Sequence, residues 1–519
     1  MKSLTKIIEL LFIVPIIILL GSLLLPFNDN WTHLTDNVLN LYLTNSAIIG
    51  ISVAIITLLI GVTTAWVTCF FNFPFRKTLS VILILPLAMP AYISAITYVG
   101  IFEDSNIIDI RNIYGAIFLI SFVLYPYVYL LARSSFLEQS KEVFENSEML
   151  SATYFKIFTK ISLPLARPSI ALGVTLATLD ALADYGTVEF LGVPTFTTGI
   201  FRVWFGMEDT ISAAQMASVF LTILFVIIIF EKNLRSKISY SESIKHSKPF
   251  ERIEIKNLSK LLCILICLIP ALIGFLIPFS QISIWAFFIS DYGWGDEFFK
   301  IAFQTLALAS LGAFIIIFTS IIISFTKRMR PDRFISRGTE IVAMGYAIPG
   351  PVIAIAVLVP LTFIDNSFGD LSLYFFEVHT GQILSGTLFT IIFAYAIRFS
   401  AIGIRTIDNG LKRISKTVDE SATMLNITER KLIKDVHMPM MKSSILTGFL
   451  IIFVDIMKEL PLTSILRPFN FNTLSVKAFE LASDEMIVDA SNLCFAIVLF
   501  GVLPVILIMR NIYGNRNHV

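Results

Sequence analysis

Residues 145–164 read ENSEMLSATYFKIFTKISLP, and residues 420–439 read ESATMLNITERKLIKDVHMP. The glutamates that open these stretches, Glu145 and Glu420, are 275 positions apart, and so are the closing prolines, Pro164 and Pro439. The two stretches therefore superpose without a gap. Both are polar and basic, whereas the chain around them is strongly apolar. A polar segment that recurs at one spacing in an apolar chain indicates a duplicated membrane protein.

The composition is that of an integral membrane protein. Of the 519 residues, 56% are hydrophobic and 15% are charged, which is too little polar surface to coat a soluble globule of this size. The formal net charge of +1 gives no overall basic field, so we expect no nucleic-acid partner. The four cysteines lie in apolar runs and the five histidines are scattered, so we expect no metal site from them. We find no phosphate-binding loop and no nucleophile elbow, and therefore expect no enzyme site.

Twelve apolar runs are long enough to cross a bilayer, six in each half. The first six are Ile7–Phe27, Ser46–Phe71, Thr78–Phe102, Tyr114–Leu131, Ser169–Val193 and Ala213–Phe230. The second six are Leu261–Phe279, Ile301–Phe325, Glu340–Ile364, Ile383–Ile404, Ser443–Leu466 and Ala490–Met509. We therefore predict an all-α integral membrane protein of about twelve transmembrane helices in two parallel six-helix repeats. The first half covers residues 1–230, a cytoplasmic linker residues 231–260, and the second half residues 261–519.

The basic residues predict the orientation in the membrane. With the N-terminus inside, most Lys and Arg residues fall on the inner side, as the positive-inside rule requires. The exceptions are five in outer loops and two within spans: Arg111, Arg202, Lys300, Arg467 and Lys477, and Arg398 and Lys458. Six spans in each half place both repeated stretches on the cytoplasmic side, together with both termini. We expect a multi-pass protein of a bacterial inner membrane.

The repeated stretches resemble the cytoplasmic coupling loop of ABC-importer permeases. That loop has a glutamate, a glycine in a turn, and then an I-x-L-P sequence. The residues that match are Glu145, Ser151, Ile161, Leu163 and Pro164 in the first copy, and Glu420, Asn426, Val436, Met438 and Pro439 in the second. Ser151 and Asn426 stand where the family has glycine, and Asn tolerates a left-handed turn more readily than Ser. The resemblance implies that each loop docks into an ATP-hydrolysing subunit.

Two further stretches resemble the ferric-iron permeases whose halves are fused in one chain. They are LADYGTVEFLGVPTFTTGIFRVWFGM at residues 182–207 and VDIMKELPLTSILRPFNFNTL at residues 454–474. The resemblance covers nearly the whole sequence. It implies two copies of an ATP-binding subunit, which would carry ATP and Mg²⁺, and an external periplasmic substrate-binding protein. No cofactor is expected on this chain.

Acidic residues inside two predicted spans are candidates for the transport path. Asp180 and Asp184 recur 275 positions later as Asp455 and Glu459, and Lys458 is close enough in sequence to pair with Asp455. These groups have a formal charge of −3 when all are ionised, which favours a cationic cargo. A charge facing lipid at mid-membrane costs about 2.5 to 3.5 kcal/mol, so we expect these side chains to face the interior or water. The alternative is that they lock helices together. Arg398 is expected to snorkel to the cytoplasmic surface.

Paired prolines interrupt two corresponding spans. Pro86 and Pro90 lie in ILPLAMPAY, and Pro349 and Pro351 lie in YAIPGPVIA. Because proline removes a backbone hydrogen bond, we predict that the helices break there. Such breaks in matching spans often mark a transport site, although a simple packing kink is an equal alternative.

The sequence leaves the cargo open. Thiamine is the alternative to ferric iron, since a thiamine permease is similarly fused and also moves a cation. Among other classes, a secondary transporter driven by an ion gradient would need no ATPase, but would have no reason to repeat its cytoplasmic loops. A structural membrane scaffold would leave the paired acids within the spans unexplained.

Overall fold

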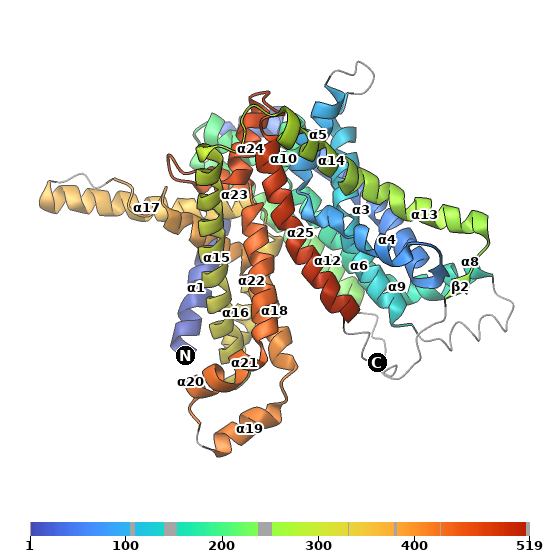
Figure 1. The fold of residues 1–519 in the computed structure, drawn as a ribbon. Coiled ribbons are helices and arrows are strands. Elements are labelled where there is room, and N and C mark those ends of the chain that lie inside the picture. Colours follow the sequence, from blue (N-terminus) through green and yellow to red (C-terminus); the bar gives the residue numbers. More distant parts are fainter. Residues whose placement is uncertain are drawn as a thin grey trace.

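The structure is a computed structural model that describes residues 2–103, 109–139, 153–236, 252–330, 332–377, 381–425 and 427–514. Nearly all regular structure in these ranges is helical, as predicted (Figure 1). Helices are labelled α, and short 3₁₀ or π-helical turns are labelled η. The first part of the chain contains α1 (Lys2–Gly21), η1 (Ser22–Leu24), α2 (Asp29–Asn37), α3 (Leu39–Phe70), α4 (Arg76–Ile82), η2 (Leu85–Ala88), α5 (Ala91–Phe102), α6 (Ile113–Leu137), α8 (Tyr154–Ile157), η3 (Phe158–Ser162), α9 (Leu163–Ala183), α10 (Gly186–Phe190), α11 (Phe196–Phe201), η4 (Arg202–Gly206) and α12 (Thr210–Ser236).

The second part of the chain is helical as well. It contains α13 (Asn257–Ala271), η5 (Leu272–Leu276), α14 (Ile277–Ile284), η6 (Trp285–Ile289), α15 (Asp296–Met329), α16 (Arg333–Val342), η7 (Gly345–Ala347), α17 (Gly350–Phe376), α18 (Leu388–Lys412), α19 (Lys416–Met424), α20 (Glu429–Leu432), η8 (Ile433–His437), α21 (Met438–Met440), α22 (Lys442–Met457), α23 (Pro461–Leu466), α24 (Leu474–Ser483) and α25 (Ser491–Gly514). One two-residue parallel pair joins β1 (Phe71–Asn72) to β2 (Ile253–Glu254).

Local sequence explains where several helices begin and end. Asn112 caps α6 by accepting hydrogen bonds from the N–H groups of Tyr114 and Gly115. The long helix α15 has Asp296 and Glu297 in its first turn and basic residues in its last, so its charges complement the helix dipole.

In the described ranges, nine helices are long and apolar enough to cross a membrane, and eleven if two sharply bent helix pairs each count as one span. The bent pairs are residues 76–102, with a bend of 93°, and residues 429–457, with a bend of 77°. The shorter apolar helix Ser491–Ile506 coincides with the last predicted span. The chain is thus a multi-pass membrane protein. The count of twelve spans, their division into two repeats and the domain boundaries stay predictions.

Several predicted spans are broken rather than continuous. The predicted span Thr78–Phe102 is divided into α4, η2 and α5, and Glu340–Ile364 into the end of α16, η7 and the start of α17. Pro90 directly precedes α5 and Pro349 directly precedes α17. Pro86 lies within η2, and Pro351 is the second residue of α17. The predicted helix breaks are therefore confirmed at both proline pairs.

Two three-helix groups form the centre of the protein, α3 with α6 and α9, and α15 with α18 and α22. Glycines let these helices approach closely. A Cβ atom on Gly61 of α3 would lie 2.6 Å from the Cβ of Val128 on α6, and one on Gly173 of α9 would lie 2.9 Å from the Cα of the same valine. A Cβ on Gly448 of α22, 275 positions after Gly173, would instead meet side chains, at 3.0 Å from Cδ1 of Ile317 on α15. Small residues at such crossings are typical of membrane helices.

The first helix of each half packs against the other half. Helix α1 lies along α16 and α17 and also contacts α15. Thr5 donates a hydrogen bond to Thr326 of α15 (2.9 Å), and Thr339 of α16 donates one to the buried Glu9 (2.8 Å). Helix α13 lies in turn against α3 and α4. The two halves are therefore joined by reciprocal packing as well as by the chain itself.

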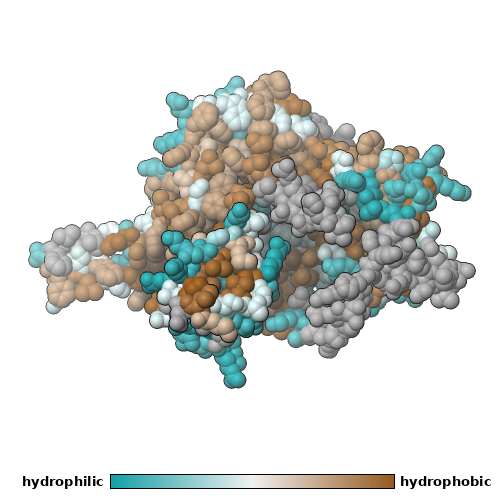
Figure 2. Space-filling model, turned by 60° about the horizontal axis from the view of Figure 1, so that its bottom comes forward, coloured by the Kyte–Doolittle hydropathy of each residue, from teal (hydrophilic) through white to brown (hydrophobic). Residues whose placement is uncertain are grey.

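Polar segments gather at one end of the protein, which we call the foot end. Figure 1 shows the start of α1, the end of α25 and helices α19–α21 at this lower end, while α10, α23 and α24 lie near the opposite end. Seen from the foot end, hydrophilic residues gather around these segments and hydrophobic ones cover much of the sides (Figure 2). This distribution suits a protein whose sides face lipid.

The packing at Gly61 can be tested by adding one methyl group. Gly61→Ala forces the new Cβ into Val128, and overpacking of this kind costs about 1–3 kcal/mol. We expect a lower melting temperature for the detergent-solubilised protein. Gly21→Ala is the matched control, because nothing lies within 4 Å of a Cβ at that position. Equal melting temperatures for the two variants would contradict the close crossing of α3 and α6.

Candidate functional site

A cavity of about 170 Å³, which we call the central cavity, lies where the two three-helix groups meet. Its walls come from both halves of the chain. The first half contributes Leu87, Met89, Pro90, Ala91, Tyr92, Val123, Leu124, Tyr127, Asp180, Ala183, Asp184, Tyr185 and Gly186, and the second contributes Tyr346, Arg398, Phe399, Asp455, Lys458, Glu459, Leu460 and Pro461. All five residues that the sequence predicts for a transport path line it, as does one of the four prolines, Pro90.

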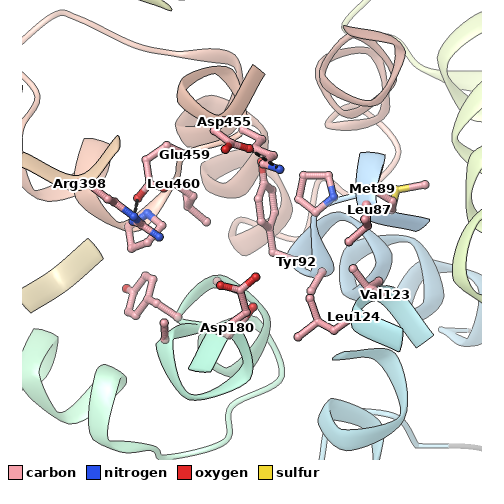
Figure 3. Close-up of a pocket in the computed structure, with 18 of the residues that line it drawn as sticks. Leu87, Met89, Tyr92, Val123, Leu124, Asp180, Arg398, Asp455, Glu459 and Leu460 are labelled. Carbon is pink, nitrogen blue, oxygen red and sulfur yellow. Dashed lines mark hydrogen bonds and ion pairs between the residues drawn. The ribbon is translucent and has the colours of Figure 1, made fainter. Parts of the chain in front are cut away.

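Asp180 and Asp455 occupy matching places on opposite sides of the central cavity. Each lies in the last turn of its helix, α9 and α22 respectively. Figure 3 shows the carboxylate of Asp180 on the side facing Asp455 and Glu459. Lys458 binds Asp455 with an N–O distance of 2.7 Å, which confirms the predicted pair. None of these side chains is on the outer surface of the bundle, as the cost of exposing a charge to lipid requires.

Asp184 and Glu459 lie just beyond the ends of α9 and α22 and cap the short helices that follow. Asp184 accepts hydrogen bonds from the backbone N–H (2.9 Å) and the hydroxyl (2.8 Å) of Thr187 in α10. Glu459 accepts one from the N–H of Leu462 in α23 (3.2 Å), at the position 275 residues after Thr187. These two carboxylates therefore have a structural role as caps in addition to lining the cavity.

Arg398 is part of the central cavity, and the expectation that it snorkels to the surface was wrong. It lies in the middle of α18, and its guanidinium donates a hydrogen bond to Glu459 at 2.7 Å. The side chains of Arg398 and Glu459 are only 16% and 7% exposed. A buried carboxylate close in space attracts the arginine more strongly than a distant membrane surface does. Arg398 lies inside a predicted span, where charged side chains usually face the protein interior, so the sequence already contained a signal for a buried position.

The described lining residues give the central cavity a formal charge of −2, from four carboxylates, Arg398 and Lys458, when all are ionised. Four tyrosines, Tyr92, Tyr127, Tyr185 and Tyr346, also line it. Sequence reasoning missed these tyrosines, because a tyrosine in an apolar run gives no signal by itself. Among the described residues, no three His, Cys, Asp or Glu side chains come together closely enough to hold a metal ion.

A second cavity of about 370 Å³ lies next to the central one on the side of the foot end. Its wall includes Glu231 and Lys232 near the end of α12, Glu340 of α16 and Arg405 of α18. We call it the lower cavity. Four residues line both cavities: Asp180, Ala183, Tyr346 and Arg398. These four form a neck between the two spaces.

The second repeated stretch forms a foot made of α19, α20, η8 and α21, which then turns into α22 (Figure 1). Glu420 lies exposed on α19, Val436 in η8, and Met438 and Pro439 in α21. Asn426 is outside the described residues. Arg328 at the end of α15 binds Asp419 at 2.7 Å, and the Nε2 of His437 lies 2.8 Å from the same carboxylate. Burial lowers the pKa of His437 despite the neighbouring Asp419, so the ring is neutral at pH 7.

Aromatic side chains contact the described part of the first foot. Ile161 lies in η3, and Leu163 and Pro164 begin α9. Glu145 and Ser151 are outside the described residues. Trp66 of α3 packs on Phe158 with ring centroids 4.8 Å apart, and Gln139 donates a hydrogen bond to the carbonyl oxygen of Ser162 (3.0 Å).

Comparison with known proteins gives relatives among transport permeases. The chain is 23% identical over 475 residues to the Fe(3+)-transport system permease protein FbpB 2 of Haemophilus influenzae, covering 90% of this chain and 89% of the relative. It is 28% identical over 141 residues to the sulfate transport system permease protein CysT of Escherichia coli, covering 25% of this chain and 51% of the relative. It is also 28% identical to the molybdate/tungstate transport system permease protein WtpB of Thermococcus kodakarensis, covering 28% and 57%.

A family model described as "binding-protein-dependent transport system inner membrane component" matches the chain twice, at residues 57–240 and 317–515. Each match contains one of the repeated stretches, so the duplication found in the sequence is a duplication of this family's unit. The two matches cover most of the chain. The protein therefore belongs to the family of inner membrane components of binding-protein-dependent transport systems, as a chain in which two such units are fused.

Proposed function

We propose that this permease moves ferric iron from an external binding protein into the cytoplasm, driven by two copies of a partner ATP-binding subunit. ATP and Mg²⁺ bind to those partners, and this chain carries no ATPase site of its own. Both termini and both feet lie in the cytoplasm. The observation that carries the proposal is the anionic central cavity, with Asp180 facing Asp455 across the junction of the two halves.

The charge of the central cavity favours a cation over an oxyanion. Two like unit charges 4 Å apart repel by about 4 kcal/mol at an effective dielectric constant of 20. Sulfate or molybdate beside Asp180 and Asp455 would meet this repulsion from more than one carboxylate. The relatives named for those oxyanions match only about a quarter of this chain, whereas the relative named for Fe(3+) matches 90% of it. Carboxylate and phenol oxygens are also the ligands that hard cations prefer.

The size of the central cavity favours a small ion. Pockets for organic ligands usually measure about 300–1,000 Å³, whereas this one is about 170 Å³. Thiamine, which is a cation of organic size, is therefore the second candidate. An ion-gradient transporter is a weaker candidate, because it would give the feet no partner.

The feet present apolar side chains that suit docking to the ATP-binding subunits. Met424 and Leu425 of the second foot are 86% and 73% exposed, and Phe155 of the first foot is 74% exposed. Such side chains next to a loop of charged residues form a compact surface for a groove on a partner. Closure of the partners on ATP would draw the feet together and turn the cavity outward, and release of the partners would turn it inward.

The cargo proposal is tested by neutralising the carboxylates that do not cap helices. We expect Asp180→Asn combined with Asp455→Asn to lower uptake of labelled ferric iron by about tenfold or more, the effect of losing about 1.4 kcal/mol of transition-state stabilisation. Uptake is measured in cells that contain the complete transporter. Asp36→Asn, which changes an exposed acid on α2, is the control and keeps normal uptake.

We expect a fourfold variant, which also carries Asp184→Asn and Glu459→Gln, to lose uptake altogether. Normal iron uptake in this fourfold variant would sink the proposal. The second candidate would be supported if the unmodified protein takes up no labelled iron and the fourfold variant loses uptake of labelled thiamine.

The coupling role is tested by reversing charge on the feet. Glu145→Lys and Glu420→Lys together should abolish uptake while the protein still inserts, because the basic side chains disturb the docking surfaces. Co-purification with the ATP-binding subunit and the ATPase rate of the complex are the measurements. Asp36→Lys makes the same charge change at an exposed acid of α2, outside both feet, and is expected to leave coupling intact. Undiminished uptake in the double variant would refute docking through these loops.

A further inference from the structure

The neck between the central and lower cavities contains a buried ion pair whose position suggests a role. Arg398 lines both cavities, whereas its partner Glu459 lines only the central one. Figure 3 shows the guanidinium of Arg398 beside Glu459 in the central cavity, and because Arg398 also lines the lower cavity, it lies between the two spaces. A passage from the central cavity to the foot end leads past this side chain.

Glu459 is held firmly in place. Its side chain caps α23 through the N–H of Leu462, and its carbonyl oxygen accepts hydrogen bonds from Thr463 (3.0 Å) and Ser475 (2.7 Å). Gly350, at the start of α17, lies directly against the pair. A Cβ on Gly350 would be 2.6 Å from Nη1 of Arg398 and 2.9 Å from Oε1 of Glu459. The glycine thus leaves just enough room for the two groups to meet.

The hydrogen-bonding groups of Arg398 are less completely paired than those of Glu459. Its Nε is buried and has no hydrogen-bond partner among the described residues. A buried donor without a partner costs free energy, which reduces the stabilisation that the arginine gains from its present position. Buried ion pairs in general add little to stability, and an arginine cannot escape burial by losing its proton. If a cation binds Glu459, the Arg398 side chain loses its partner and has to move.

The lower cavity offers the arginine another place. Its described charged lining residues are Asp180, Glu231 and Glu340, with Lys232, Arg398 and Arg405, a formal charge of zero. A cation that passes the neck therefore leaves a space with a formal charge of −2 for one with no net charge. Binding becomes weaker toward the exit, which is what release requires.

We propose that Arg398 is a tethered cation that gates the path. Held by Glu459, its guanidinium closes the neck in the absence of cargo. A cargo cation in the central cavity competes for Glu459 and displaces Arg398 toward the lower cavity, which opens the neck. This inference rests on the proposed function only in taking the cargo to be a cation, and its test needs no cargo.

Cysteine labelling from the foot end tests the gate. Ala91 lines the central cavity alone and Ala343 the lower cavity alone, and the four native cysteines are buried. Ala91→Cys and Ala343→Cys are introduced separately into the complete transporter, in inverted membrane vesicles without ATP. The probe is a small, uncharged, membrane-impermeant thiol reagent. We expect Arg398→Gln to speed labelling at Ala91→Cys by about tenfold or more, as loss of one charge-assisted hydrogen bond predicts, and to leave labelling at Ala343→Cys unchanged.

Two further variants separate the gate from a general effect of charge. Lys458→Gln removes the same charge from the central cavity but not from the neck, and should leave labelling at Ala91→Cys slow. Gly350→Ala keeps both charges and pushes the pair apart, so it should speed labelling even if Arg398→Gln fails to fold. Slow labelling in both Arg398→Gln and Gly350→Ala, or equally fast labelling in Lys458→Gln, would overturn the gate. Failure of iron uptake alone would overturn only the identity of the cargo.

Discussion

The structure depends on one constraint, that charges and backbone groups carried into an apolar interior have to be compensated there. The helices α9 and α22 end inside the protein, and at each end a carboxylate turns back to satisfy the first N–H groups of the next short helix. Arg398 compensates Glu459, and Lys458 compensates Asp455. The compensation is incomplete, and it leaves the described lining of the central cavity with a formal charge of −2 when all groups are ionised.

The two halves carry matching acidic residues but place different side chains around the central cavity. The paired acids and the glycines Gly173 and Gly448 recur at one spacing, but Gly173 lies against the backbone of α6 whereas Gly448 lies against side chains of α15 and α18. Around the central cavity, however, α6 contributes Val123, Leu124 and Tyr127, whereas α18 contributes Arg398 and Phe399. Among the described contacts, Arg328 pairs with Asp419 at the second foot, and Trp66 packs on Phe158 at the first.

These contacts tie each described foot to one helix of a central group. Arg328 ends α15, a helix of one central group, and Trp66 belongs to α3 of the other.

Much of this protein could be read from its sequence because the signals are periodic or paired. The apolar runs predicted where membrane helices lie, the repeated loops predicted the family, and the repeated acids predicted residues that line one cavity. Proline chemistry predicted the breaks before α5 and α17, since a missing N–H acts locally whatever surrounds it. The capping by Asp184 could not be read in this way, because it depends on how the chain turns after α9.

The sequence by itself determined the class of protein, since hydropathy, charge distribution and an exact internal spacing are properties of the chain alone. Only the tertiary structure decided what the intramembrane charges do. Arg398 is far from Glu459 in sequence, and nothing local distinguishes an arginine that reaches a membrane surface from one that reaches a buried carboxylate. Packing of α18 against α23 and α17 brings the two together, and this contact places a positive charge in the neck of the path.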